Sequence, residues 1–156
     1  MSWKRNAWDV GIRLVATSAR RSPRTARALT RALGALTLRI QGGRPKVGAA
    51  DVGAEWQRMF PSPKMVPLRG VDEATQTVRA ELHSPCPLRG TGDVEACHRM
   101  MEYDRRLLER IGGQLVVLAS QAEPGRTFCE VAIRPVGVGT EDLEAAHVRV
   151  RRLPVV

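Results

Sequence analysis

Hydrophobic residues in the first 40 positions recur at intervals of three and four, the spacing of one face of an α-helix. The pattern predicts a helix over residues 3–19. Ser22-Pro23 interrupts it, and proline is favoured in the first turn of a new helix, so we expect a second helix over 23–40. We expect the apolar face of that helix to be buried against the rest of the chain or against a second copy in a homodimer; it carries Leu29, Leu33, Leu36 and Ile40.

The middle of the chain changes from a helical period to an alternating one. A short helix is predicted over 51–60, and the prolines after it prevent its continuation. Residues 64–70 and 75–82 then form a predicted hairpin around Asp72-Glu73. In the second of these strands one side is apolar, formed by Val78, Ala80 and Leu82.

The clearest helical pattern covers residues 94–111, where Asp93 is a suitable N-cap. Residues 115–121 and 127–134 alternate and predict a second hairpin, and 141–146 are expected to form one last helical turn or two. In the last hairpin strand the apolar, core-facing side is formed by Cys129, Val131 and Ile133.

This order predicts an α/β (α+β) fold with an N-terminal helix pair, a short helix, a β-hairpin, a long helix and a second hairpin. A chain of 156 residues is long enough for one hydrophobic core. We divide it into a basic helical arm (1–46), an α/β domain of ligand-binding type (47–136) and a C-terminal extension (137–156).

The net charge of +9 resides in the arm. Residues 1–50 hold 11 of the 25 Lys and Arg residues and one acid, Asp9, so they carry +10, while the remaining 14 basic and 15 acidic residues carry −1. Such an asymmetry suits nucleic acid, an anionic surface or an acidic partner.

The cellular location of the protein is predicted from two features that the sequence does not contain. No apolar run reaches the roughly 20 residues of a membrane-spanning helix, and the three cysteines have no CxxC spacing, so we expect reduced thiols in the cytoplasm. The start of the chain, rich in Arg and Ser and poor in acids, also has the composition of an organelle transit peptide.

An acid lies in the middle of the apolar stripe of helix 94–111. The stripe comprises Cys97, Met100, Met101, Asp104, Leu107, Leu108 and Ile111. A buried carboxylate is unfavourable unless it is paired or hydrogen-bonded. Asp104 is therefore either a member of a structural ion pair or hydrogen bond, or a pocket-lining acid with an altered pKa that is usable in ligand binding or proton transfer.

The three cysteines are expected to lie near this stripe. Cys97 is in the first turns of the helix, where the N-terminal amides favour a thiolate, and Cys129 faces the core from the last strand. Either cysteine is equally a small buried apolar residue. With Cys86 and a histidine, His83 or His98, they form a set of zinc-ligand types. The close-spaced ligand pairs of most zinc sites are absent, so we assign no metal or other cofactor.

From about residue 64 to 134 the chain resembles two groups of proteins, the 4-vinyl reductase type of small-molecule-binding domain and the L-2-amino-thiazoline-4-carboxylic acid hydrolase-like family. The resemblance rests on a hairpin, a proline-flanked Cys86, a helix that opens with Cys97-His98, and a Gly-rich turn before Cys129. It implies a ligand-binding α/β domain and, for the second group, ring opening of a small thiazoline acid.

The chain departs from the zinc-binding members of the first group, in which the resemblance implies a Glu and a Cys on the strand after the helix. Residues 115–121 contain neither. The second group is matched better, because an acid further along the helix corresponds to Asp104.

Three hypotheses follow. The leading one is a small-molecule-binding domain with a pocket between the Cys97–Asp104 helix face and the final hairpin, lined also by Cys86, His98, Met101 and Cys129. The second is a hydrolase of a small cyclic acid, with Asp104 as general base and Cys97 as nucleophile. The third is an interaction protein that docks through the basic arm.

The arm generates a testable prediction. Its arginine stripe lacks the interleaved aromatic residues that stack on bases, so we expect weak, salt-sensitive DNA binding that is blind to sequence. Fluorescence anisotropy with two unrelated duplexes at low and high salt measures this. Tight binding that persists at high salt would contradict it. The stripe consists of Arg20, Arg21, Arg24, Arg27 and Arg31.

Overall fold

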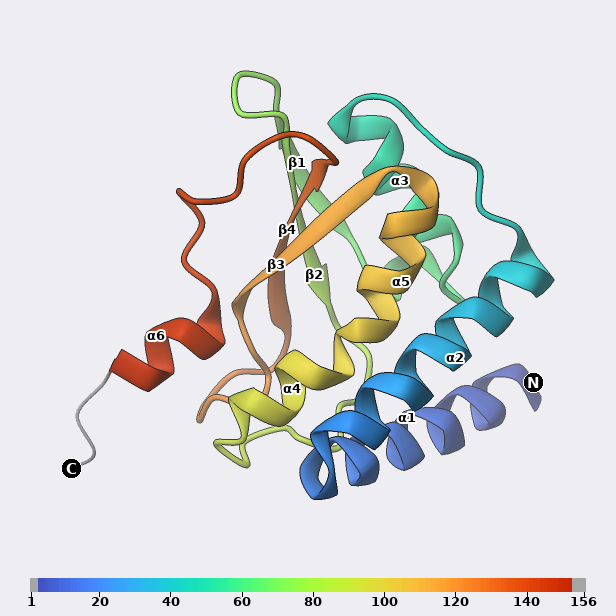
Figure 1. The fold of residues 1–156 in the computed structure, drawn as a ribbon, viewed down its shortest axis with the longest axis vertical. Coiled ribbons are helices and arrows are strands. Elements are labelled where there is room, and N and C mark those ends of the chain that lie inside the picture. The colour runs from blue at the N-terminus through green and yellow to red at the C-terminus, as the bar shows by residue number, and fades with distance from the viewer. Residues whose placement is uncertain (1–2, 153–156) are drawn as a thin grey trace.

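A computed structural model describes residues 3–152, with the side chains of residues 10–152. It contains one antiparallel sheet with the strand order β1-β2-β4-β3, and helices pack against it (Figure 1). The strands are β1 (Leu68–Asp72), β2 (Thr77–Leu82), β3 (Gly113–Ala119) and β4 (Cys129–Pro135). The helices are α1 (Trp3–Arg21), α2 (Pro23–Gln41), α3 (Ala49–Arg58), α4 (Val94–Met100), α5 (Glu102–Ile111) and α6 (Ala146–Arg152), with one 3₁₀ turn at Pro63–Met65.

The predicted α/β class and the order of its elements are confirmed. The alternation of the strands also holds, because β2 places Val78, Ala80 and Leu82 in the core and pairs through Val78 with Ile133 of β4. The first predicted strand is shorter than expected, since Ser62 caps a 3₁₀ turn with Pro63 in its first position, and pairing begins only at Leu68.

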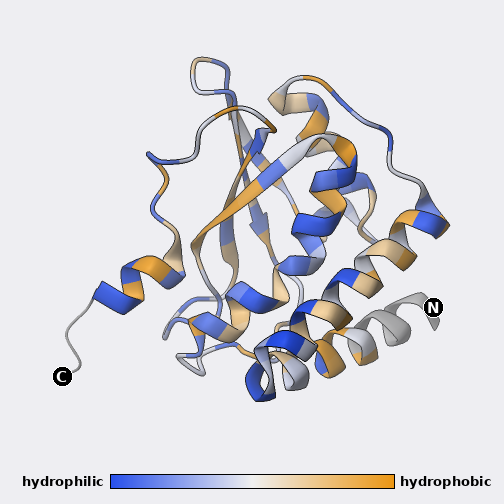
Figure 2. Cartoon of the chain, in the orientation of Figure 1, coloured by the Kyte–Doolittle hydropathy of each residue, from blue (hydrophilic) through white to orange (hydrophobic). Residues whose placement is uncertain are grey.

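Helices α3 and α5 cover the core face of the sheet, and α1 and α2 lie outside them on α4 and α5. Figure 2 shows the hydrophobic and hydrophilic residues that alternate along α2, α4 and α5, as layers packed on one side require. One core cluster joins residues from all parts of the chain, including Ala19 of α1, Ala26 of α2 and Ala146 of α6. No helix within residues 3–152 is long and apolar enough to cross a bilayer.

The predicted helix over 94–111 is in fact two helices, and the break lies at Met101. That residue has φ −68° and ψ −1° and ends α4 while it begins α5. The carbonyl of His98 accepts a hydrogen bond from Arg105 Nη1 at 2.9 Å, which satisfies an acceptor at the end of α4. The inward stripe survives the break, because Cys97, Met101 and Asp104 are all buried.

The last helix lies further along the chain than predicted. Residues 141–146 were expected to be helical, but α6 begins at Ala146, and the preceding segment forms turns and bends that Arg134 holds in place. This guanidinium, 4% exposed on the outer face of the sheet, pairs with Asp142 at 2.6 Å and donates to Gly139 O. The segment therefore shields a charged residue of β4 that a simple in-and-out alternation places in solvent.

The arm packs on the domain through its smallest residues. Ala26, Thr30 and Gly34 form the buried face of α2, whereas Leu36 is 51% and Ile40 75% exposed. Burial of the whole leucine stripe against the rest of the chain is therefore wrong for these two residues. Their burial against a second copy stays a prediction.

Arginines of the arm pair with acids of the domain. Arg31 binds Glu109 through two hydrogen bonds of 2.7 and 3.0 Å and Glu102 through one of 3.3 Å, and Arg27 lies 3.4 Å from Glu102. Arg20 lies 3.7 Å from Asp93. Each partly exposed pair contributes roughly 0–1 kcal/mol. Some of the basic residues that give the arm its positive charge therefore pair with acidic residues of the domain in the same chain.

The close approach of α2 and α5 can be tested at Gly34. A Cβ there would lie 3.1 Å from both Tyr103 O and Arg106 Cβ, so Gly34→Leu should lower the free energy of unfolding by about 1–3 kcal/mol through overpacking. Ala32→Leu, at an exposed position of the same helix, is the control and should change it by less than about 0.5 kcal/mol. Urea unfolding measures both. Equal effects would contradict the proposed contact.

Candidate functional site

Two cysteines from distant parts of the sequence meet in the interior. Cys97 of α4 and Cys129 at the start of β4 are each 4% exposed and belong to the same core cluster, where each thiol shifts the pKa of the other. The backbone N–H of Gln121 donates to Cys129 Sγ at 3.2 Å. Ser120 acts on Cys97 and lowers the pKa of its thiol, against the larger effects that raise it.

The two thiols differ in acidity because the donors converge on one of them. The hydrogen bond from Cys97, followed by that from Gln121, lowers the pKa of Cys129. The pKa of Cys97 is raised well above its ordinary range, first by its own hydrogen bond to Cys129 and then by burial. The geometric feature that distinguishes Cys129 from Cys97 is the backbone N–H of Gln121, 3.2 Å from Cys129 Sγ.

Gln121 fastens the loop 83–92 beside this pair. Its side chain, 1% exposed, donates through Nε2 to Leu82 O and Ser84 O at 3.0 and 3.2 Å. Its Oε1 accepts from Arg89 at 2.7 Å, and its backbone carbonyl accepts from the N–H of Gly90 at 2.9 Å. One residue thus orients Cys129 and holds the neighbouring loop.

Cys86 lies in that loop and is half-buried against the core. Burial raises the pKa of its thiol, and the charge of Cys129 raises it further. The structure therefore brings all three cysteines to one region: Cys97 and Cys129 belong to the core cluster, Cys86 packs against it, and the thiols affect one another electrostatically.

Asp104 is buried, as the sequence predicted, at 5% exposure. Its partner is an indole: Trp56 Nε1 of α3 donates to Asp104 Oδ1 at 3.1 Å. Burial raises the pKa of Asp104 to about 7, and the hydrogen bond from Trp56 opposes that rise. Asp104 also acts electrostatically on Cys129, so the acid and the thiol pair belong to the same interior region.

The histidines lie elsewhere. His98 stacks on His147 of α6 with a centroid distance of 3.7 Å, and its Nδ1 lies 3.1 Å from Arg105 Nη2. Burial and the neighbouring Arg105 lower the pKa of His98 to about 4. His83 is exposed and lies 2.6 Å from Glu81 Oε2. Within residues 3–152, no group of three His, Cys, Asp or Glu residues is arranged to hold a metal ion.

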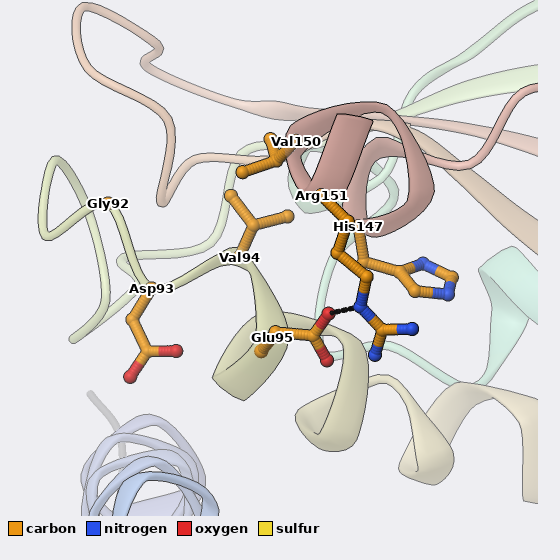
Figure 3. Close-up of a pocket in the computed structure, with 7 residues that line it drawn as sticks. All are labelled: Gly92, Asp93, Val94, Glu95, His147, Val150 and Arg151. Atoms are coloured by element: carbon orange, nitrogen blue, oxygen red, sulfur yellow. Dashed lines mark hydrogen bonds and ion pairs between the residues drawn. The ribbon is translucent and has the colours of Figure 1, made fainter. Parts of the chain in front are cut away.

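A surface hollow of about 110 Å³ lies between the start of α4 and α6 (Figure 3). An ion pair between Glu95 and Arg151 crosses it. It does not contain the cysteines or Asp104, and the predicted pocket region holds packed side chains such as Met101 and Leu107. The hollow is lined by Gly92, Asp93, Val94, Glu95, His147, Val150 and Arg151.

Sequence reasoning missed the residues that organise this region. Trp56 was recognised only as a member of a short helix, although a buried indole N–H needs an acceptor and Asp104 was an unpaired buried acid. Ser120 and Gln121 are uncharged residues at a predicted strand end. Nothing in their spacing indicates that they hydrogen-bond to cysteines.

Comparison with protein-family models, with curated proteins and with solved structures found no match for this chain. The resemblance to the 4-vinyl reductase and thiazoline-acid hydrolase-like groups stays an expectation.

The buried acid predicts a defined pH dependence of stability. The pKa of Asp104 rises from 3.8 to about 7 on folding, so the folded state keeps its proton where the unfolded state loses it. Asp104 is therefore neutral to stability below pH 4 and destabilises the protein increasingly as the pH rises towards 7, by about 4 kcal/mol in total.

Asp104→Asn keeps an acceptor for Trp56 and removes this titration. The free energy of unfolding of the variant, relative to the unsubstituted protein, should rise between pH 4 and 7. Urea unfolding at several pH values measures the difference. Asp51→Asn, at an exposed position of α3, is the control. A difference independent of pH would show that Asp104 is ionised in the folded state throughout.

Proposed function

We propose that this protein binds a small organic molecule in the interior between the inner faces of α4 and α5 and the strand β4. The observation that carries the proposal is the gathering of reactive polar groups where an aliphatic core would be more stable. Cys97, Cys129 and Asp104 come from two segments of the chain and occupy one buried region. A buried acid with a raised pKa is typical of functional sites, although structural networks also produce such shifts.

Asp104 supports the proposal by its incomplete pairing. A carboxyl group offers about four acceptor positions. Besides its own backbone N–H, the donor described for Asp104 is Trp56 Nε1. An N–H or O–H of a bound molecule would supply a further donor and compensate the unfavourable burial. The preferred ligand is therefore a small molecule with a hydrogen-bond donor next to an apolar body.

The loop 83–92 provides a route of entry. It inserts Leu88, which is fully buried, and its hydrogen bonds to the rest of the chain come from the Gln121 side chain, from Arg89 to Thr127 O, and from the backbone N–H groups of His83, Gly90 and Gly92. Both glycines have positive φ angles, +67° and +75°, which other residues rarely adopt. Withdrawal of Leu88 would open the interior beside the thiol pair.

A panel of small organic acids and amides, with 2-amino-thiazoline-4-carboxylic acid among them, tests the proposal by ligand-observed NMR. Asp104→Asn should weaken the binding of any hit about tenfold or more, the loss of one hydrogen bond to a charged or strongly polar group. Asp51→Asn is the matched control and should bind normally. Hits that bind Asp104→Asn equally well, or a panel without hits, would contradict the proposed site.

A hydrolytic function is favoured by one specific observation, the lowered pKa of Cys129 beside an acid whose pKa is about 7. In that version Cys129 is the nucleophile in place of Cys97. Release of a free thiol from 2-amino-thiazoline-4-carboxylic acid, followed with a colorimetric thiol reagent, distinguishes it from binding alone. Binding of this acid without thiol release would leave the binding proposal standing and exclude this reaction.

A further inference from the structure

We propose that the outer surface of the helix pair α1 and α2 docks the protein peripherally on a membrane that contains anionic lipid. This inference goes beyond small-molecule binding and does not depend on it. It rests on aliphatic side chains that the fold leaves exposed on both helices and on the arginines that accompany them. The exposed aliphatic residues are Val10 and Leu14 of α1 and Leu36 and Ile40 of α2.

These aliphatic residues form one i, i+4 pair on each helix, so the two members of a pair share a face. Their exposed fractions are 59% and 60% on α1 and 51% and 75% on α2. The two helices pack on each other and extend to the same side of the turn at Ser22 (Figure 1). Val10 and Leu36 lie at similar distances from that turn, about 18 and 21 Å at 1.5 Å per residue. Single exposed aliphatic residues are normal on a protein surface, whereas these four gather on one helix pair.

The charges on this part of the chain have one sign. Residues 10–50 contain nine of the 25 Lys and Arg residues and no Asp or Glu. Three of the nine pair with acids of the domain, as described above. Among residues 10–152, Arg21, Arg24 and Arg39 form no ion pair, and all three are exposed. These arginines are available to lipid headgroups, and each basic residue close to an anionic membrane raises its affinity by about fivefold.

Other occupants suit this surface less well. A second copy would meet it across a twofold axis, which sets the same patch, and therefore the same arginines, against itself. Nucleic acid would use the arginines but not the aliphatic side chains, and residues 10–50 contain no Phe, Trp or Tyr to stack on bases. An anionic bilayer uses both, because its headgroups attract the cations while aliphatic side chains enter the boundary with the acyl chains.

The proposed surface is separate from the face that holds the arm on the domain. Ala26, Thr30 and Gly34 form the buried face of α2, and Gly34 lies against α5. The exposed residues of the pair lie outside this contact. Docking on lipid therefore needs no unfolding of the arm.

Flotation of the folded, full-length protein with vesicles tests the proposal. One set of vesicles consists of equal parts of phosphatidylcholine and phosphatidylglycerol, and the other of phosphatidylcholine alone. We expect binding to the anionic vesicles to be about tenfold stronger or more. Added salt should weaken it without abolishing it, since screening acts on the charges and leaves the apolar contacts. Failure to bind the anionic vesicles, or equal binding to both sets, would overturn the proposal.

Two variants with matched controls assign the binding to this surface. Ile40→Gln should weaken it about fivefold, whereas Val71→Gln, at an exposed position of β1, should leave it unchanged. Arg24→Glu should weaken it about tenfold or more, whereas Arg79→Glu on β2 makes the same change in net charge and should weaken it less than about twofold. Urea unfolding checks that all four variants are folded. Controls that weaken binding as much as the arm variants would sink the proposal.

The other two occupants give distinct results. Sedimentation equilibrium that shows a dimer, dissociated by Ile40→Gln and unable to bind the anionic vesicles, would assign the surface to a second copy and contradict the proposal. Binding of duplex DNA that is tighter than vesicle binding at the same salt concentration, and that Ile40→Gln leaves unchanged, would assign it to nucleic acid and contradict the proposal equally.

Discussion

The buried amide of Gln121 is the interaction on which the candidate site depends. A side chain with both donor and acceptor atoms can hold two segments in one specific relative position, because hydrogen bonds depend on direction and hydrophobic contacts do not. Gln121 uses Nε2 for carbonyls at the end of β2 and Oε1 for Arg89 of the loop, and its backbone N–H reaches Cys129. Buried polar networks contribute more to a unique arrangement than to net stability, and here the arrangement in question is that of the thiols and the loop over them.

Most of the fold could be predicted from the pattern of apolar residues, because burial of one face dictates the period of each element. Val78, Cys129 and Ile133 were placed in the core correctly on that ground alone. Caps were equally informative: Asp93, predicted as an N-cap, accepts from the N–H of Ala96 at 2.8 Å. Such a cap depends on an interaction between near neighbours in the sequence, which a single sequence reveals.

The errors share a different physical origin. The burial of Arg134 depends on Asp142, eight positions away, and on Thr77, 57 positions away, and the exposure of Ile40 depends on the direction in which α2 packs. The break at Met101 is accompanied by the hydrogen bond from Arg105 to the His98 carbonyl, which the stripe of apolar residues does not reveal. For α2 the leucine stripe was predicted to be the buried face, but the face that packs closely against α5 is formed by the small residues around Gly34. At the site, burial of Asp104 was foreseen from its stripe, whereas its indole partner was not, since the two residues are 48 positions apart.

The docking of the arm has a consequence for synthesis on the ribosome. The face of α2 that carries Thr30 and Gly34 is covered by α5, and the pairs of Arg31 reach 71 and 78 positions along the chain. At about 5–20 residues per second the arm waits roughly 4–15 seconds for these partners to be synthesised. During this interval the contacts of the folded structure that α1 and α2 can make are those with each other. The small, polar-flanked face of α2 attracts fewer wrong contacts in that time than a face of leucines would.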